Sequence, residues 1–293
     1  MRIANHDGRL VVVAPEPPAP SAGGGETPPL RAVDVETTSN GLFGSDPQAI
    51  YERWAEFRGW AESVDFGRAE PVPERSLRAA VPRPRQVFAI GLNYRDHAAE
   101  SGFEIPAEPV VFTKYVSSFT GPFGDITLSP GDVDWEVELV AVVGARARGV
   151  GESAGWDYVA GLTVGQDISD RTVQFAAALP QFGLGKSFPG FSPVGPVLVT
   201  PDELPDRDDV ELGCEVNGVS VQKGRTADLV FPVPTLIAKL SAIVELLPGD
   251  VIFTGTPDGV GHGRDPRRYL HAGDVLTSWI TGIGTMKHRF VAA

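Results

Sequence analysis

Short runs of β-branched and aromatic residues, separated by glycine, proline or aspartate, set the limits on what this chain can fold into. Such runs are typical of strands, and the residues between them are those that tight turns require. The pattern therefore predicts a fold that is mostly β with a few helices, of the α+β class. We expect strands over residues 86–90, 110–112, 126–128, 136–143, 159–164 and 194–199.

One hairpin and three helices complete these expectations. Asn217-Gly218 separates the runs 211–216 and 219–222, and both residues tolerate the positive φ of a type I′ turn. Helices are predicted where apolar residues recur every three or four positions. They are one helix after Ser45-Asp-Pro47 that carries Ile50, Trp54, Phe57 and Ala61, one from near Pro234 to Leu247, and a shorter one after Ser169.

Two proline pairs indicate where the chain divides. Pro71-Val-Pro73 and Pro82-Arg-Pro84 bracket a connector, so we expect a small N-terminal domain over 1–80 and a main domain over 81–293. Residues 14–31 are rich in proline and glycine, a composition that argues against regular strand pairing. We expect them to form a surface loop.

The composition excludes several classes of partner. With 38 acidic and 25 basic residues the formal charge is −13, and no block of basic residues compensates for it, so binding to nucleic acid is not expected. No apolar window approaches the roughly 18 residues of a membrane-spanning helix, and the N-terminus lacks the apolar core of a signal peptide. We therefore expect a soluble cytoplasmic protein. Cys214 is the only cysteine, so no intrachain disulfide can form, and we expect its thiol to be buried as a small apolar group.

Two glutamates one residue apart carry the strongest chemical signal. Glu136 and Glu138 lie on a β-branched run, and because side chains alternate along a strand, both carboxylates leave the same face. Like charges held roughly 6–7 Å apart favour a cation between them, and an exposed acidic edge is the alternative. Asp167 ends the run 159–167 and adds a third carboxylate, although it could equally cap the helix that follows. Three hard oxygen ligands favour Mg²⁺ or Mn²⁺.

The segment 91–102 combines a histidine and a glutamate at helical spacing. A helix over 95–101, ended by Gly102, places His97 and Glu100 on one face, where they can form a hydrogen bond. Such a pair can deprotonate water, one group acting as the base while the other orients it. A surface contact without a catalytic role is the alternative.

Two further elements offer positive charge and hydrogen-bond donors. Lys186 is the only charged residue in 182–196, and its ammonium could neutralise an enolate or carboxylate beside the metal. A lysine that extends to solvent is the alternative. After a predicted strand, Thr254, Gly255 and Thr256 offer hydroxyl and main-chain N–H donors suited to a ligand carboxylate, and their spacing does not match a phosphate-binding loop.

These motifs, in this order, resemble the fumarylacetoacetate hydrolase family over about residues 85–291. The segments that carry the resemblance are Gly91-Leu-Asn-Tyr-Arg-Asp-His97, Asp134-Trp-Glu-Val-Glu-Leu139, Gln166-Asp-Ile-Ser-Asp-Arg171, Gly185-Lys-Ser-Phe188 and Phe253-Thr-Gly-Thr-Pro-Asp-Gly-Val-Gly261. The resemblance implies a mixed β-sandwich roll with a small N-terminal domain, usually a homodimer, and one divalent metal ion, Mg²⁺ or Mn²⁺, per active site.

The resemblance also implies roles for the matching residues. The metal ligands would be Glu136, Glu138 and Asp167. Lys186 would face the oxyanion, and His97 with Glu100 would be a water-activating pair on a lid. The substrate site would be lined by Arg171, Gln174, Gly255 and Thr256.

The activity that the resemblance implies is metal-dependent hydrolysis of a C–C bond in a 2,4-dioxo acid, such as an acylpyruvate or a fumarylpyruvate-like acid, through a metal-stabilised enolate. A small-molecule 2-oxo acid would then be the partner. An isomerase, decarboxylase or hydratase of an unsaturated 2-oxo diacid in aromatic catabolism is the second hypothesis. A metal-bound ligand sensor without catalytic activity is the third.

Overall fold

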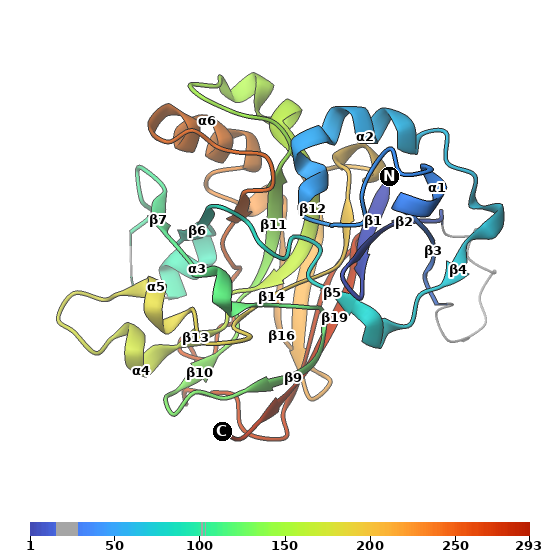
Figure 1. The fold of residues 1–293 in the computed structure, drawn as a ribbon. Coiled ribbons are helices and arrows are strands. Elements are labelled where there is room, and N and C mark those ends of the chain that lie inside the picture. Colours follow the sequence, from blue (N-terminus) through green and yellow to red (C-terminus); the bar gives the residue numbers. More distant parts are fainter. Residues whose placement is uncertain (16–28, 101, 103) are drawn as a thin grey trace.

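The computed structural model describes residues 1–15, 29–100, 102 and 104–293, and a large β-sheet runs through it (Figure 1). Most of the expected loop at 14–31 therefore lies outside the described residues. The strands of this sheet are β1 (Arg2–His6), β2 (Arg9–Val13), β3 (Arg31–Asp34), β4 (Glu70–Pro71), β5 (Leu77–Arg78), β6 (Val87–Gly91), β7 (Val110–Phe112), β8 (Phe119–Thr120), β11 (Val137–Val143), β12 (Val159–Gln166), β14 (Ser192–Val199) and β17 (Val251–Phe253). Their order is β4-β3-β2-β1-β14-β12-β11-β17-β6-β7, with β5 paired to β1 and β8 to β14.

A second, smaller sheet packs against the first. Its strands are β9 (Phe123–Thr127), β15 (Glu211–Val216), β16 (Val219–Arg225), β18 (Val275–Ile280) and β19 (Gly284–Val291), in the order β16-β15-β18-β19-β9. Two short strands, β10 (Val133–Asp134) and β13 (Ser169–Asp170), pair separately. Most pairs are antiparallel, but β6 with β17, β9 with β19 and β8 with β14 are parallel, so both large sheets contain mixed pairing.

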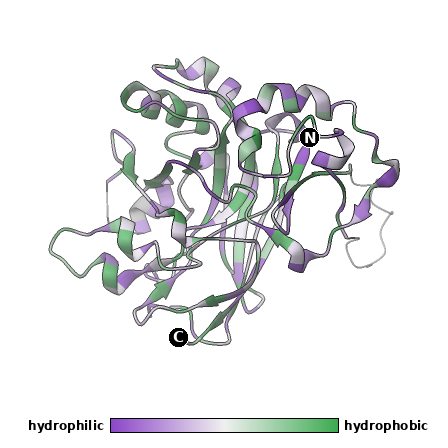
Figure 2. Ribbon diagram, viewed as in Figure 1, coloured by the Kyte–Doolittle hydropathy of each residue, from purple (hydrophilic) through white to green (hydrophobic). Residues whose placement is uncertain are grey.

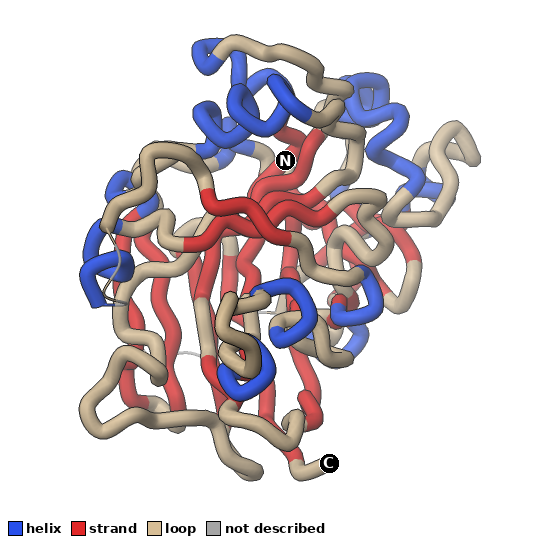
Figure 3. The backbone as a smooth tube through the Cα atoms, turned by 90° about the vertical axis from the view of Figure 1, so that its left-hand side faces the viewer, coloured by secondary structure: helices blue, strands red, loops and turns tan. Residues whose placement is uncertain are grey.

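The helices are short and lie around the strands, which run through the middle of the molecule in Figure 3. The α-helices are α1 (Val35–Thr38), α2 (Trp54–Ala61), α3 (Arg95–Glu100), α4 (Arg171–Gln174), α5 (Phe182–Gly185) and α6 (Val233–Ile243). The 3-10 turns are η1 (Ala49–Arg53), η2 (Phe66–Arg68), η3 (Glu74–Ser76), η4 (Val116–Ser118), η5 (Glu152–Tyr158), η6 (Pro201–Glu203) and η7 (Thr226–Asp228). Over the described part of the chain, no helix has the length and hydropathy that a bilayer crossing needs.

Two apolar clusters cover the two faces of the central strands. Because side chains alternate along β11, Leu139 belongs to the buried cluster that includes Phe290 of the smaller sheet, whereas Val140 belongs to the cluster of Trp54 and Phe57 from α2. Hydrophobic residues accordingly follow the central strands and α6 in Figure 2, while α2 shows polar residues on its outer side. Burial on both faces explains why β11 carries no charge beyond Glu138.

The expected elements are confirmed with small shifts at their ends. Asn217 and Gly218 have φ of 54° and 77°, as the type I′ hairpin requires. The first helical stretch begins at Ala49 as η1 and continues as α2, and α6 ends at Ile243 rather than Leu247. The domain boundary at residue 80 stays a prediction, and β1 of the N-terminal part pairs directly with β14 of the main part.

Candidate metal centre and active site

Three buried carboxylates meet where β11 begins and β12 ends. Glu136 and Glu138 lie at the start of β11, and Asp167 follows the last residue of β12. The two strands are antiparallel neighbours with Val137 opposite Gln166, so the start of one lies beside the end of the other. One ligand oxygen from each carboxylate lies within 4.8 Å of the other two. The alternating strand geometry therefore brings the predicted triad together.

Two glutamine side chains fix the backbone that carries the glutamates. The Gln166 side-chain oxygen accepts a hydrogen bond from the Glu136 amide, and that of Gln222 accepts one from the Val137 amide, both at 2.9 Å. Both glutamines are buried. The amides of Glu136 and Val137 are thus satisfied where β11 starts, which holds the first glutamate in register with Asp167.

Two cationic side chains lie against the triad. The Lys186 ammonium donates to Glu136 Oε2 at 2.6 Å and to Asp167 Oδ2 at 2.7 Å, and with 3% exposure it does not extend to solvent. The Arg171 guanidinium donates to Glu136 Oε1 at 2.7 Å, and also to the side chains of Asp134 and Gln174. Of the residues predicted to line the substrate site, Arg171 thus contacts the triad and Gln174 contacts Arg171, and their contact with a substrate stays a prediction.

The electrostatics of the triad fit a divalent cation. Burial raises the pKa of Glu138 well above its usual value, and the charges of Asp167 and Glu136 add to this shift. Burial acts in the same direction on Glu136, but the charges of Lys186, Arg171 and His97 outweigh it and lower the pKa of Glu136. Glu138 thus lacks the cationic contacts that its neighbour has. Three hard oxygen donors with one carboxylate left uncompensated are suited to Mg²⁺ or Mn²⁺.

The predicted histidine–glutamate pair forms on helix α3. His97 Nδ1 lies 3.2 Å from Glu100 Oε2, and both carboxylate oxygens of Glu100 also accept the Gly259 amide. Because a carboxylate oxygen accepts, Nδ1 donates to Glu100, and Nε2 takes no part in this contact. The histidine is 8% exposed, so the pair is not a solvated surface contact.

The turn after β17 bonds to the strand that carries the glutamates. Its three predicted donors are used within the protein, so their contact with a substrate stays a prediction. The Thr254 hydroxyl donates to the Leu139 carbonyl at 2.8 Å, and the Thr256 hydroxyl donates to the Val137 carbonyl at 2.9 Å. The Gly255 amide donates to Glu138 Oε2 at 2.7 Å.

Asp134 fixes the later part of the glycine-rich turn that follows β17. Its carboxylate accepts the main-chain amides of Gly261 and His262 at 2.7 and 3.0 Å and the Arg171 side chain at 2.8 Å. It therefore links the glycine-rich turn to the guanidinium that contacts Glu136. The sequence analysis included Asp134 in a motif but did not predict its contacts with this turn and with Arg171.

Lys114 is a buried cation of the site that sequence reasoning did not single out at all. It is 1% exposed, and its ammonium donates to Asp167 Oδ1 at 2.5 Å and to the carbonyls of Lys186 and Phe191. Burial lowers the pKa of Lys114, but a neutral amine has only two N–H groups, so three acceptors require the ammonium. The available signal was the one that marked Lys186, a single charged residue in an otherwise uncharged stretch, here 109–124.

Comparisons with known proteins agree with this arrangement. A family model described as fumarylacetoacetate (FAA) hydrolase C-terminal matches residues 86–291. Human oxaloacetate tautomerase FAHD2A, mitochondrial, is 41% identical over 223 residues, which cover 75% of this chain and 71% of that protein.

Solved structures extend the similarity over the whole chain. A Mycobacterium smegmatis protein named for HpcE is 51% identical, with a TM-score of 0.91 and 100% of both chains covered. Maleylpyruvate hydrolase from Sphingobium sp. SYK-6, in complex with manganese(II) ion and pyruvate, is 27% identical, with a TM-score of 0.78 and 100% of both chains covered. The fold, the buried triad and the matched span together show that this chain belongs to the fumarylacetoacetate hydrolase family.

Proposed function

We propose that the protein is a divalent-metal-dependent hydrolase that cleaves a C–C bond in a 2,4-dioxo acid of the acylpyruvate type. The observation that carries this proposal is the buried triad of Glu136, Glu138 and Asp167, with a lysine ammonium against it. Mg²⁺ or Mn²⁺ would be held by the triad. The manganese ion and pyruvate in the maleylpyruvate hydrolase structure support this choice of metal and of substrate class.

In this proposal Lys186 stabilises negative charge on the substrate. Two of its three N–H groups bond to Glu136 and Asp167, which leaves one for a substrate oxygen. A divalent cation, when bound, supplies Lewis acidity to the oxygens of a 2-oxo acid. The ammonium in a buried site strengthens that stabilisation, since charge interactions are larger where water is excluded.

In this proposal His97 and Glu100 activate water. Nε2 of His97 takes a proton from water while Glu100 holds Nδ1–H, and the water oxygen attacks the carbonyl carbon distal to the carboxylate. The bond from that carbon to the methylene carbon then breaks, and its electron pair passes to the pyruvate enolate. The enolate carbon takes the proton back from Nε2, so the products are pyruvate and the acid of the acyl group.

A second candidate is tautomerisation, isomerisation or decarboxylation of a 2-oxo diacid. The specific observation in its favour is the 41% identity to human oxaloacetate tautomerase FAHD2A. These reactions need the same stabilised enolate but no nucleophilic water. They would therefore use Lys186 and the triad and make no demand on His97 as the base for water.

An assay with two histidine variants separates the candidates. The metal-loaded protein is incubated with acetylpyruvate, fumarylpyruvate, maleylpyruvate and oxaloacetate, and loss of enol absorbance and release of pyruvate are both measured. We expect pyruvate release from at least one acylpyruvate, its loss in His97→Ala, and no change in His271→Ala, which alters an exposed histidine. Enol conversion without pyruvate release, or release of pyruvate with CO2 from oxaloacetate alone, equal in both variants, would establish the second candidate. No change in any acid would contradict both.

We also propose that the protein is a homodimer. Val111, Tyr115 and Val116 are exposed apolar residues, at 46%, 51% and 43%, and a partner surface would bury such side chains. Light scattering coupled to size exclusion is expected to give about twice the 31.2 kDa of the chain. The mass of a single chain would contradict this.

A further inference from the structure

Lys114 is a fully buried cation whose three donors are all used by the active site. It donates to one oxygen of Asp167 and to the carbonyls of Lys186 and Phe191, and it lies above the Phe253 ring at 5.8 Å from Nζ to the centroid. No N–H group remains for a substrate oxygen. Lys114 therefore differs from Lys186, whose ammonium donates to two acceptors within the described part of the chain and keeps a third N–H group.

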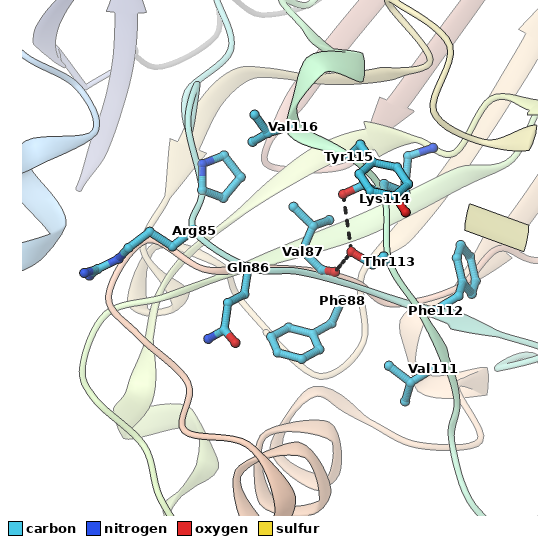
Figure 4. Close-up of a pocket in the computed structure, with 11 residues that line it drawn as sticks. Arg85, Gln86, Val87, Phe88, Val111, Phe112, Thr113, Lys114, Tyr115 and Val116 are labelled. Atoms are coloured by element: carbon cyan, nitrogen blue, oxygen red, sulfur yellow. Dashed lines mark hydrogen bonds between the residues drawn. The ribbon is translucent and has the colours of Figure 1, made fainter. Parts of the chain in front are cut away.

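The backbone of Lys114 is fixed on both sides. Phe112 pairs with Ala89 of β6, the Thr113 hydroxyl donates to the Val87 carbonyl at 2.9 Å, and the Tyr115 amide donates to the Ser187 hydroxyl at 3.0 Å. This segment lines a surface pocket of about 540 Å³, and the three carboxylates of the triad are not among the residues that line that pocket. Figure 4 shows the Lys114 side chain extending in the direction opposite to the Arg85 guanidinium. The ammonium thus projects inward from an anchored segment.

The two lysines divide the two oxygens of Asp167 between them. Lys114 binds Oδ1 at 2.5 Å and Lys186 binds Oδ2 at 2.7 Å, so the carboxylate cannot rotate without breaking a charged contact. Because Lys114 also holds the Lys186 carbonyl, the second lysine is fixed through its own backbone. The Phe112 ring lies 5.2 Å from the Lys186 ammonium and supports it from the same segment.

We infer that Lys114 is a positioning residue that fixes the orientation of the metal ligand Asp167 and of Lys186, an inference that rests on the proposed function. Two effects of Lys114 on metal affinity oppose each other. A positive charge next to a ligand repels a divalent cation, so its removal would tighten binding. Loss of the hydrogen bond that orients a ligand weakens binding, by about 10–100-fold where such outer partners have been removed from metal sites. The inference requires that orientation outweighs repulsion.

The test is Mn²⁺ binding followed by electron paramagnetic resonance, which needs no substrate. We compare the unaltered chain with Lys114→Met and with Lys223→Met, a control that removes the same charge at an exposed lysine paired with Glu211. We expect Lys114→Met to weaken Mn²⁺ binding by about 10-fold or more and to change the line shape of bound Mn²⁺, because the ligand geometry is no longer fixed. Lys223→Met should match the unaltered chain in both readouts.

Several outcomes would overturn the inference. Unchanged or tighter Mn²⁺ binding by folded Lys114→Met would contradict the inference. It would show that the loss of ligand orientation does not outweigh the relief of charge repulsion. If this variant does not fold, Lys114→Gln keeps two N–H donors without the charge, and it should fold and bind Mn²⁺ with intermediate affinity. Failure of both variants to fold would assign Lys114 a purely structural role. Absence of Mn²⁺ binding by the unaltered chain would instead contradict the proposed function, so the two failures are distinguishable.

Discussion

The main-chain amide of Gly259 donates to the carboxylate of Glu100, at 3.0 Å to Oε1 and 3.2 Å to Oε2. This contact joins α3, the helix of the histidine–glutamate pair, to the glycine-rich turn after β17. Gly259 has a φ of +96°, and a Cβ atom there would lie 2.1 Å from the Val221 carbonyl oxygen. Only glycine fits this position, so the turn sets the orientation of the carboxylate that holds His97.

Replacement of this glycine should therefore affect stability and activity together. Gly273 has nearly the same φ, +95°, but open space around its Cβ position, so Gly273→Ala isolates the cost of the left-handed backbone, about 1–2 kcal/mol. Gly259→Ala adds a close approach to backbone and should lower the free energy of unfolding by about 3 kcal/mol. Urea unfolding measures both. Equal losses would contradict the steric argument, and a full hydrolysis rate in Gly259→Ala would show that the turn does not orient Glu100.

Glu100→Gln tests the histidine–glutamate pair without touching the triad. An amide cannot stabilise the imidazolium that forms when His97 takes a proton, so kcat for hydrolysis should fall by about 10²-fold or more. Mn²⁺ affinity should not change, because the printed contacts of Glu100 are with His97 and Gly259 and not with the triad. A full kcat for hydrolysis in Glu100→Gln would contradict the proposed role of the pair.

The sequence was informative where a local rule fixes geometry. The two-residue period of a strand forces Glu136 and Glu138 onto one face, and Asn217-Gly218 has the dihedral preference of one turn type. Lys114 escaped prediction because its acceptors are remote in the chain, with Asp167 lying 53 positions away and Phe191 lying 77. No local pattern reports such contacts, because they arise only when strands from distant segments are placed side by side.

The same limit applies to the donors of the turn after β17. Thr254 bonds to a carbonyl 115 positions away and Thr256 to one 119 positions away, both on β11. From the sequence these hydroxyls looked available for a ligand carboxylate. Because β17 pairs with β11 in the folded chain, the two hydroxyls instead bond to the strand that carries the glutamates.

The two glutamates should respond differently to neutralisation in metal-free protein. Glu136 bonds to Lys186 and Arg171, so Glu136→Gln leaves two buried cations without their shared carboxylate and should cost about 3–5 kcal/mol. Among the described residues, the Glu138 side chain bonds only to the Gly255 amide. The glutamine oxygen can still accept that bond, so Glu138→Gln should leave stability unchanged or raise it. Urea unfolding in EDTA measures this contrast, and both variants should lose Mn²⁺ affinity. An equal loss of stability in the two variants would contradict the charge pairing.

A buried histidine far from these carboxylates should make the fold sensitive to mild acid. His288 on β19 is 1% exposed, its Nε2 donates to the Gly121 carbonyl at 3.0 Å, and no described residue bonds to its Nδ1. Burial lowers the pKa of His288 from 6.5 to about 4, against the smaller opposing effect of the Gly121 hydrogen bond. Between these two pH values the unfolded chain binds the proton and the folded chain does not. The contribution of neutral His288 to the free energy of unfolding is therefore complete above pH 6.5 and is lost as the pH falls toward 4.

This loss should amount to about 3 kcal/mol over that interval, because each pKa unit is worth about 1.4 kcal/mol. The variant that tests it is His288→Gln, whose amide can still donate to the Gly121 carbonyl but does not titrate. Urea unfolding at a series of pH values should show the stability of the unaltered chain falling relative to the variant as the pH decreases, while the carboxylate triad titrates in both and cancels. His6→Gln serves as the control, since it makes the same exchange of side chain at a histidine on β1, and its curve should run parallel to that of the unaltered chain. The prediction would be contradicted if the stability difference between the unaltered chain and His288→Gln stayed constant from pH 6.5 to 4. The buried imidazole would then bind its proton equally well in the folded and the unfolded chain.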